Sequence, residues 1–186
     1  GDVYKRQGVT ASAIAMNKIY FKRLVINATE NSNDPINFPK TLEILPDRSI
    51  DFKNHYGAFV VKPINGGSSV GVEIIREGDQ VPIINSTTSY NLMAEEYVGS
   101  KELTVTVLQE QPLCVTEIKA GQDKDFYNYE AKYEKNGSIH DIPAKISKNT
   151  YNQAMSWALR VHQIIGCKGI SRSCLLYTSD AADDYI

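Results

Sequence analysis

The chain has 186 residues, 22 acidic and 20 basic, and a formal net charge of −2 at pH 7. That length fits one domain, or one domain and part of another. Apolar residues make up 42% of the chain, enough for a buried core. The balanced charge argues against nucleic acid as a main partner, and no apolar run reaches the roughly 18–20 residues that span a bilayer. We therefore expect neither a nucleic-acid nor a membrane partner.

The cysteines are three in number and widely spaced, without a CxxC pair: Cys114, Cys167 and Cys174. The histidines are also dispersed: His55, His140 and His162. An odd cysteine count does not suit a disulfide framework, and the spacings are not those of a zinc site. We expect free thiols in a cytoplasmic protein, surface or half-buried histidines, and no metal ligands.

The first predicted element is a helix over residues 10–28, because alanines and long side chains follow residues that can cap it. Thr10 and Ser12 are the candidate caps. The polar, proline-containing segment 29–40 that follows is expected to be a loop.

The middle of the chain is rich in predicted strands. Residues 57–63 and 70–75 form one strand pair, and 91–108 holds two more strands around Gly99. In the second of these, apolar residues at 103, 105 and 107 alternate with the rest, as in a strand with one buried face. Residues 112–120 are another predicted strand.

A long polar and aromatic segment, residues 121–147, is expected to lack regular structure, and a helix follows over residues 149–166. Asn149 or Thr150 can cap this helix, and Gly166 can end it. Dense neighbouring strands with helices at both ends indicate an α+β fold with antiparallel sheets rather than a doubly wound parallel sheet.

Both ends of the chain lack the patterns of the middle. Residues 1–7 and 174–186 resemble peptides translated from sequencing-adaptor DNA at the edge of a gene fragment. On this interpretation native sequence runs from about Gly8 to Ser173, and residues 175–186 pack against nothing in particular. Ordinary ragged termini are the alternative.

The glycine-rich segment "NGGSSVG", residues 65–71, is longer than a hairpin turn needs. Its backbone N–H groups and two hydroxyls suit phosphate oxygens, and Lys62 in the preceding strand supplies positive charge. No GxxxxGK[ST] motif is present, so the segment is closer to a flap over a nucleotide than to a P-loop. A mobile turn remains the simpler alternative.

Three carboxylates lie where the two later strands meet: Glu95, Glu96 and Glu102. The backbone at such a joint can pair with an adenine edge, and a carboxylate such as Glu102 can accept from ribose hydroxyls. A solvated acidic hairpin tip is the alternative.

In the long segment that follows, the tyrosines and phenylalanine favour a functional loop over disorder.

These motifs together resemble the D-alanine–D-alanine ligases of the ATP-grasp superfamily. The matching segments are "AMNK", "FVVKPINGGSSVGV", "AEEYVGSKELTVTVL", "FYNYEAKY" and "GCKGISRS", in the family's order. The resemblance implies an incomplete ATP-grasp fold of two adjoining α+β lobes. Its central lobe would span residues 8–103, and part of a C-terminal lobe with the long active-site loop would span 104–173.

The resemblance also implies a set of ATP-binding residues: Lys18, Lys62, Gly66, Gly67, Ser69, Glu95, Val98, Glu102 and Lys132. Lys18 and Lys62 would contact the phosphates under the glycine-rich flap. Glu95 and Val98 would frame the adenine, and Glu102 would hold the ribose.

The catalytic residues implied by the resemblance are Ser68, Tyr133 and Arg172. Ser68 and Tyr133 would bridge the flap to the long loop, where Lys132 would reach toward the transferred phosphate. Arg172 would stabilise the phosphorylated intermediate and the tetrahedral adduct.

The family's reaction joins two D-alanine molecules through an acyl phosphate for peptidoglycan synthesis, with ATP and Mg²⁺. The family has a magnesium-binding aspartate two residues after the arginine, where Cys174 stands here. The later ligands and the N-terminal domain are not found either, so we expect this chain to be inactive alone.

Alternatives are another ATP-grasp carboxylate–amine ligase, a D-alanine–D-lactate ligase (Tyr133 favours the dipeptide enzymes) and a non-catalytic nucleotide-binding fragment. A homodimer of the full-length enzyme is left open.

Overall fold

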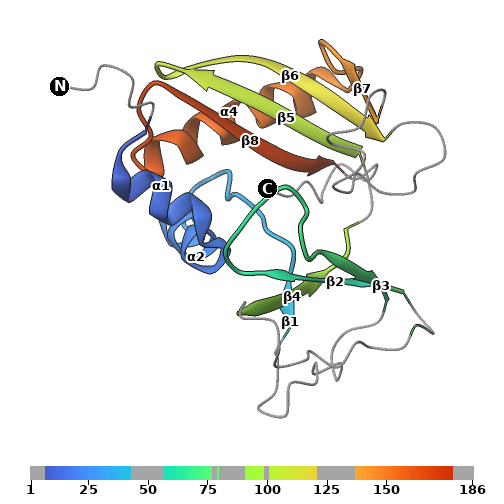
Figure 1. The fold of residues 1–186 in the computed structure, drawn as a ribbon. Coiled ribbons are helices and arrows are strands. Elements are labelled where there is room, and N and C mark those ends of the chain that lie inside the picture. Colours follow the sequence, from blue (N-terminus) through green and yellow to red (C-terminus); the bar gives the residue numbers. More distant parts are fainter. Residues whose placement is uncertain are drawn as a thin grey trace.

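The structure is a computed structural model that describes residues 7–42, 57–76, 79, 91–98, 101–120 and 137–177. The elements, in chain order, are α1 (Val9–Met16), α2 (Lys18–Thr29), β1 (Thr41–Leu42), β2 (Phe59–Pro63), β3 (Glu73–Ile75), β4 (Leu92–Glu96), β5 (Lys101–Leu108), β6 (Gln111–Ala120), β7 (Ser138–Asp141), α4 (Lys148–Ile164) and β8 (Ile170–Tyr177). The described strands form two four-stranded antiparallel sheets: the first sheet has the order β1–β4–β2–β3, and the second sheet has the order β7–β6–β5–β8 (Figure 1). The predicted α+β class with antiparallel sheets is confirmed.

The predicted first helix is in fact two helices separated by Asn17. Asn17 is extended (φ −104°, ψ 104°), and its side-chain oxygen accepts from the Tyr20 N–H at 3.0 Å, which caps α2. Its backbone pairs with Asn65, and the next N–H, that of Lys18, donates to the Ile64 carbonyl at 3.0 Å. The break therefore docks the start of α2 onto the glycine-rich segment.

The expected cap at the start of this region was wrong. Gly8 is the N-cap of α1, and it makes no side-chain cap bond. Thr10 and Ser12 both lie inside the helix. Helix α1 is short, and its only buried residue is Ala11.

The chain passes from one sheet to the other between Glu96, where β4 ends, and Lys101, where β5 begins. All of β5 pairs with β8 on one side, and most of it pairs with β6 on the other. The expected lobe boundary between residues 103 and 104 falls inside β5. The division of the chain into lobes at that point stays a prediction.

The predicted alternation in β5 is confirmed. Leu103, Val105 and Val107 are buried, with at most 1% exposed, and belong to the main apolar core. Helix α4 packs on β5, β6 and β8 from this side (Figure 1), and its Trp157 and Ala158 fill the same core.

Helix α4 begins earlier than predicted. Its N-cap is Ser147, whose Oγ accepts from the Thr150 N–H at 3.1 Å, so Asn149 and Thr150 are helical residues rather than caps. The helix stops just before Gly166, which has a φ of +70°, as predicted. The preceding segment also differs from the prediction in its described part, because β7 pairs with β6 there. Residues 121–136 lie outside the described residues.

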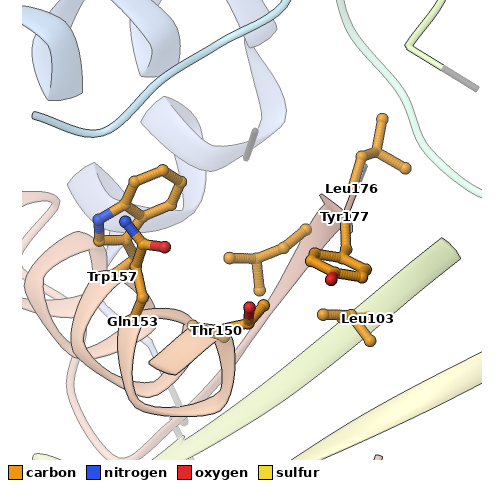
Figure 2. Close-up of a pocket in the computed structure, with 8 residues that line it drawn as sticks. Leu103, Thr150, Gln153, Trp157, Leu176 and Tyr177 are labelled. Carbon is orange, nitrogen blue, oxygen red and sulfur yellow. The ribbon is translucent and has the colours of Figure 1, made fainter. Parts of the chain in front are cut away.

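The expectation that residues 175–186 pack against nothing is wrong for 175–177. These residues complete β8 and pair with the start of β5, and Leu175 is only 4% exposed. Figure 2 shows Tyr177 beside Leu103, across from Thr150 and Trp157 of α4. The gap between them, about 10 Å³, is about the size of one water, so it is a packing defect rather than a ligand site. Residues 178–186 lie outside the description.

The segment between α2 and β1 is a loop, as predicted, and α4 holds it through Asp34. The carboxylate of Asp34 accepts from the indole N–H of Trp157 at 3.0 Å and from Arg160 at 3.1 Å. Arg160 also donates to the Asp34 carbonyl at 2.6 Å.

Of the described helices, none is long and apolar enough to cross a membrane.

Replacing Asp34 should destabilise the fold by removing the acceptor of a buried indole. We expect Asp34→Ala to lower the free energy of unfolding by about 1–3 kcal/mol, because Trp157 is 1% exposed and its N–H loses its partner. Asp34→Asn, which keeps an acceptor but loses the charge, should cost less. Urea unfolding measures both, and equal losses would assign the effect to the charge instead.

Candidate functional site

The glycine-rich segment forms a tight turn at its tip. The Val70 N–H donates to the Gly67 carbonyl at 3.2 Å, and the two central residues, Ser68 and Ser69, have φ values of 57° and 58°. Positive φ at both central positions is the pattern of a type I′ turn, which usually takes glycine or asparagine. Serine in this conformation carries backbone strain, so the turn places two hydroxyls at its tip at some energetic cost.

Two glycines allow the turn to fold back along the end of β2. Gly66 has a φ of +118° and Gly71 a φ of +69°, and both values disfavour residues with a Cβ. At Gly71 a Cβ would also lie 3.0 Å from Cγ of Pro63. The sequence needs glycine here because the backbone approaches β2 closely.

Lys18 fastens helix α2 to this turn. Its ammonium group donates to the carbonyls of Pro63, at 2.8 Å, and Gly66, at 3.1 Å. Burial lowers the pKa of Lys18 below its ordinary value, and repulsion from Lys62 adds to the effect, while attraction to Glu95 partly opposes it. The amine is therefore held at the base of the turn, next to a second cation.

A buried carboxylate, that of Glu95 on β4, is shared by two lysines. Its Oε1 lies 2.8 Å from Nζ of Lys22, and its Oε2 pairs with Nζ of Lys62. Glu95 is 5% exposed, and a carboxylate so buried is stable only when paired. Because Lys18 lies near Lys62 and Glu95, three ammonium groups face one carboxylate among the described residues, and this described cluster carries surplus positive charge beside the turn.

Val98 and Glu102 lie on either side of the change between sheets. Val98 follows β4, in a segment fastened by the Tyr97 N–H, which donates to the Ala58 carbonyl at 3.0 Å. Glu102 is the second residue of β5, opposite Ile118 of β6. These two predicted nucleotide-binding residues are thus near in sequence but belong to different sheets.

Arg172 lies on β8, in the other sheet from Lys62. It is exposed and, with Cys174, lines a cavity of about 480 Å³ that α1 and the end of α4 also line. His162 lines it too, but it is 1% exposed, and its Nδ1 lies 2.7 Å from Oγ of Ser171. The expectation of a surface or half-buried histidine was wrong here, because His162 lies on the face of α4 that packs into the core.

The remaining predicted residues, Lys132 and Tyr133, lie outside the described residues. In the described part of the chain, no group of three or more histidine, cysteine, aspartate or glutamate side chains could hold a metal ion. At position 174, where the resemblance implies a magnesium ligand, Cys174 offers a thiol rather than a hard oxygen, so the described residues do not fit Mg²⁺.

The structure thus brings together Lys18, Lys62, Gly66 and Glu95, with Gly67, Ser68 and Ser69 in the adjoining turn. It places Arg172 and Glu102 on the other sheet. Sequence reasoning missed Lys22 in this cluster. The available signal was its position four residues after Lys18, which puts both lysines on one side of a helix.

Comparison with known proteins assigns these features to a family. The model of the family described as "D-ala D-ala ligase C-terminus" matches residues 46–182. The D-alanine–D-alanine ligase of Sinorhizobium fredii is 40% identical over 178 residues, which cover 91% of this chain and 55% of that protein. D-alanine–D-alanine ligase B of Mesorhizobium japonicum is 36% identical, covering 95% and 57%. The chain therefore spans about half the length of these relatives.

Solved structures share the fold. D-alanyl-alanine synthetase A from Vibrio cholerae superposes with a TM-score of 0.72 at 24% identity, covering 97% of this chain and 56% of that one. The Bacillus anthracis D-alanine–D-alanine ligase complexed with ATP gives 0.71 at 17% identity, covering 96% and 55%. The fold is thus that of the ATP-grasp ligases. On the family match, the chain belongs to the D-alanine–D-alanine ligase family and corresponds to its C-terminal part.

Proposed function

We propose that this chain is the ATP-binding part of a ligase that joins two D-alanine molecules. The observation that carries the proposal is the surplus positive charge beside the glycine-rich turn, where Lys18 and Lys62 converge on Gly66 and Glu95. A polyphosphate is the ligand class that such a cluster favours. The relatives named above, and the ATP complex of the Bacillus anthracis ligase, support ATP as that ligand.

The proposed binding roles follow from residue chemistry. Lys18 and Lys62 bind phosphate oxygens by charge-assisted hydrogen bonds, and the flap of Gly66, Gly67 and Ser69 closes over them. The carbonyls that Lys18 now contacts are neutral acceptors, so an anionic oxygen competes well for its ammonium group.

The base and ribose lie, on this proposal, across the joint between the sheets. Glu95 and the backbone near Val98 frame the adenine, and Glu102 accepts hydrogen bonds from the ribose hydroxyls. A nucleotide bound in this way would contact both sheets, which explains why its predicted contacts change sheet between residues 98 and 102.

The proposed reaction has two steps. A D-alanine carboxylate oxygen attacks the γ-phosphorus of ATP, and ADP leaves as an acyl phosphate forms. The amine of a second D-alanine then attacks the acyl carbon, the C–O bond to phosphate breaks, and the amine loses a proton as the dipeptide forms. Negative charge accumulates on oxygens in both steps, so fixed cations lower both barriers.

The proposed catalytic residues stabilise negative charge or keep the flap closed. Arg172 stabilises the anionic oxygens of the intermediates, and Ser68 with Tyr133 holds the flap shut so that water does not hydrolyse the acyl phosphate. Lys132 reaches the transferred phosphoryl group. We derive no step through Mg²⁺, because the described residues do not fit it. With this reaction, the protein would act in the cytoplasm, in the synthesis of peptidoglycan precursors.

Lys62 and Glu102 should differ in their kinetic effects when tested in a full-length ligase that contains this chain. We expect Lys62→Ala to raise the KM for ATP and to lower kcat about 10²–10³-fold, because phosphoryl charge grows in the transition state. Glu102→Ala should raise the KM for ATP roughly tenfold with little change in kcat, since the ribose contact is uniform. Steady-state kinetics, with Lys119→Ala as control, tests both; a change in the KM for D-alanine alone would contradict the assignment.

The lowered pKa of Lys18 predicts how ATP binding depends on pH. Phosphate binds the protonated amine, so affinity should fall as pH rises through the pKa of Lys18, which lies below the ordinary value of 10.5. Lys18→Arg keeps its charge in this range and should remove that part of the decline. Calorimetric titrations with ATP at rising pH measure the difference; parallel curves for both proteins would exclude Lys18 as a phosphate ligand.

The chain by itself should show no phosphate release that depends on D-alanine. Cys174 cannot replace a hard oxygen ligand of Mg²⁺, and without the metal the charges of the β- and γ-phosphates are not neutralised. A coupled phosphate-release assay, omitting ATP, Mg²⁺ and D-alanine in turn, is the measurement. Turnover that required all three would show that the chain is a complete catalyst.

A further inference from the structure

Lys22 has a role that the predicted set of nucleotide ligands does not include. Its ammonium group has three N–H donors, and the structure gives it three acceptors: the Pro39 carbonyl, Oγ1 of Thr41 at 2.7 Å and Oε1 of Glu95 at 2.8 Å. Its side chain is only 13% exposed. Lys22 is therefore fully used inside the protein and has no donor left for a phosphate.

Glu95 has a different cation on each of its oxygens. Lys22 contacts Oε1 from α2, and Lys62 contacts Oε2 from β2. The Lys62 side chain is the more exposed of the two lysines, at 24%, and it lies in the strand that leads into the glycine-rich turn. Lys62 is thus the more accessible of the two partners of Glu95, and Lys22 is the more enclosed.

We propose that Lys22 is a positioning residue for nucleotide binding: it is the fixed counter-ion of Glu95, and it allows Lys62 to exchange Glu95 for a phosphate. This inference rests on the proposed function. If Lys62 alone compensated the buried carboxylate, its transfer to a phosphate would leave Glu95 charged and unpaired, which is strongly unfavourable. With Lys22 in place, Glu95 keeps one ion pair throughout.

The other charges near Glu95 fit this exchange. Lys18 repels Lys62 and is attracted by Glu95, so it also favours moving Lys62 toward an anion. Glu96, the neighbour of Glu95, accepts from the Lys40 N–H at 2.7 Å, so its carboxylate is held by the residue that precedes β1. Lys22 also holds β1 through Thr41, so its three bonds fix the frame around the carboxylate.

The test compares the affinities of ATP and adenosine, because only ATP needs Lys62 to leave Glu95. Isothermal titration calorimetry on the purified chain gives both constants. Lys22→Met should weaken ATP binding about tenfold relative to adenosine, a mid-range value for charged groups in direct contact. Lys119→Met is the matched control. Lys119 also pairs with a carboxylate, that of Asp141 at 2.6 Å, but it lies on the second sheet. The ratio of ATP affinity to adenosine affinity should not change in this variant.

A double variant separates positioning from folding. When Glu95→Gln removes the buried charge, Lys62 no longer needs a replacement, so Lys22→Met added to Glu95→Gln should leave the ratio of ATP to adenosine affinity within about twofold of that of Glu95→Gln alone. This comparison also serves if Lys22→Met alone does not fold. A tenfold lower ratio in the double variant would overturn the inference.

The outcomes separate the inference from the proposed function. If the unmodified chain does not bind ATP, the proposed function fails as ATP binding by this chain, and the inference fails with it. If ATP binds and Lys62→Met weakens it, but Lys22→Met lowers ATP and adenosine affinity equally or not at all, the inference alone is wrong.

Discussion

The buried carboxylate of Glu95 is the constraint around which the first sheet is arranged. It lies on β4, its two cations come from α2 and β2, and Lys22 extends the contact to β1 through Thr41. Losing both lysines would leave this carboxylate unpaired in a site that is 5% exposed, at a cost of several kcal/mol. Lys18 is one helical turn before Lys22, so the same constraint fixes its position beside the glycine-rich turn.

Helix α2 joins this charged site to the apolar part of the molecule. The core of the first sheet is small, with buried residues only from β1 to β4 in the described part: Leu42, Phe59, Val61, Ile75 and Ala94. The core under α4 is larger, and it includes Val25, on the same helix as Lys22. The same side of α2 therefore carries Lys18 and Lys22 to the first sheet and, one turn further along, Val25 into the larger core. The site gains its rigidity from a core that belongs mostly to the second sheet.

The strands and the long C-terminal helix could be predicted from sequence, because alternation and helical spacing are local signals. The break at Asn17 could not, since residues 9–29 have a continuous helical composition and the competing partners, Ile64 and Asn65, lie far along the chain. The end of β8 was missed because it is an edge strand in which only Leu175 is buried, so alternation is weak. The sequence motifs include the lysines and glycines that the structure brings together, but not Lys22, because Lys22 contacts a carboxylate 73 residues away.

The register of β8 against β5 is regular through position 174, although a cysteine stands there. Arg172 is opposite Thr106 and Cys174 is opposite Thr104, on the face away from α4, and the Cys174 thiol lies 3.9 Å from Oγ1 of Thr104. The backbone thus holds position 174 in a regular ladder although its side chain is a soft sulfur group that does not suit Mg²⁺. The lysine cluster, by contrast, depends on side chains of α2, β2 and β4 and on none from β8. The lysine cluster and position 174 therefore belong to different elements, so the side chain at one can change while the other keeps its place in the fold.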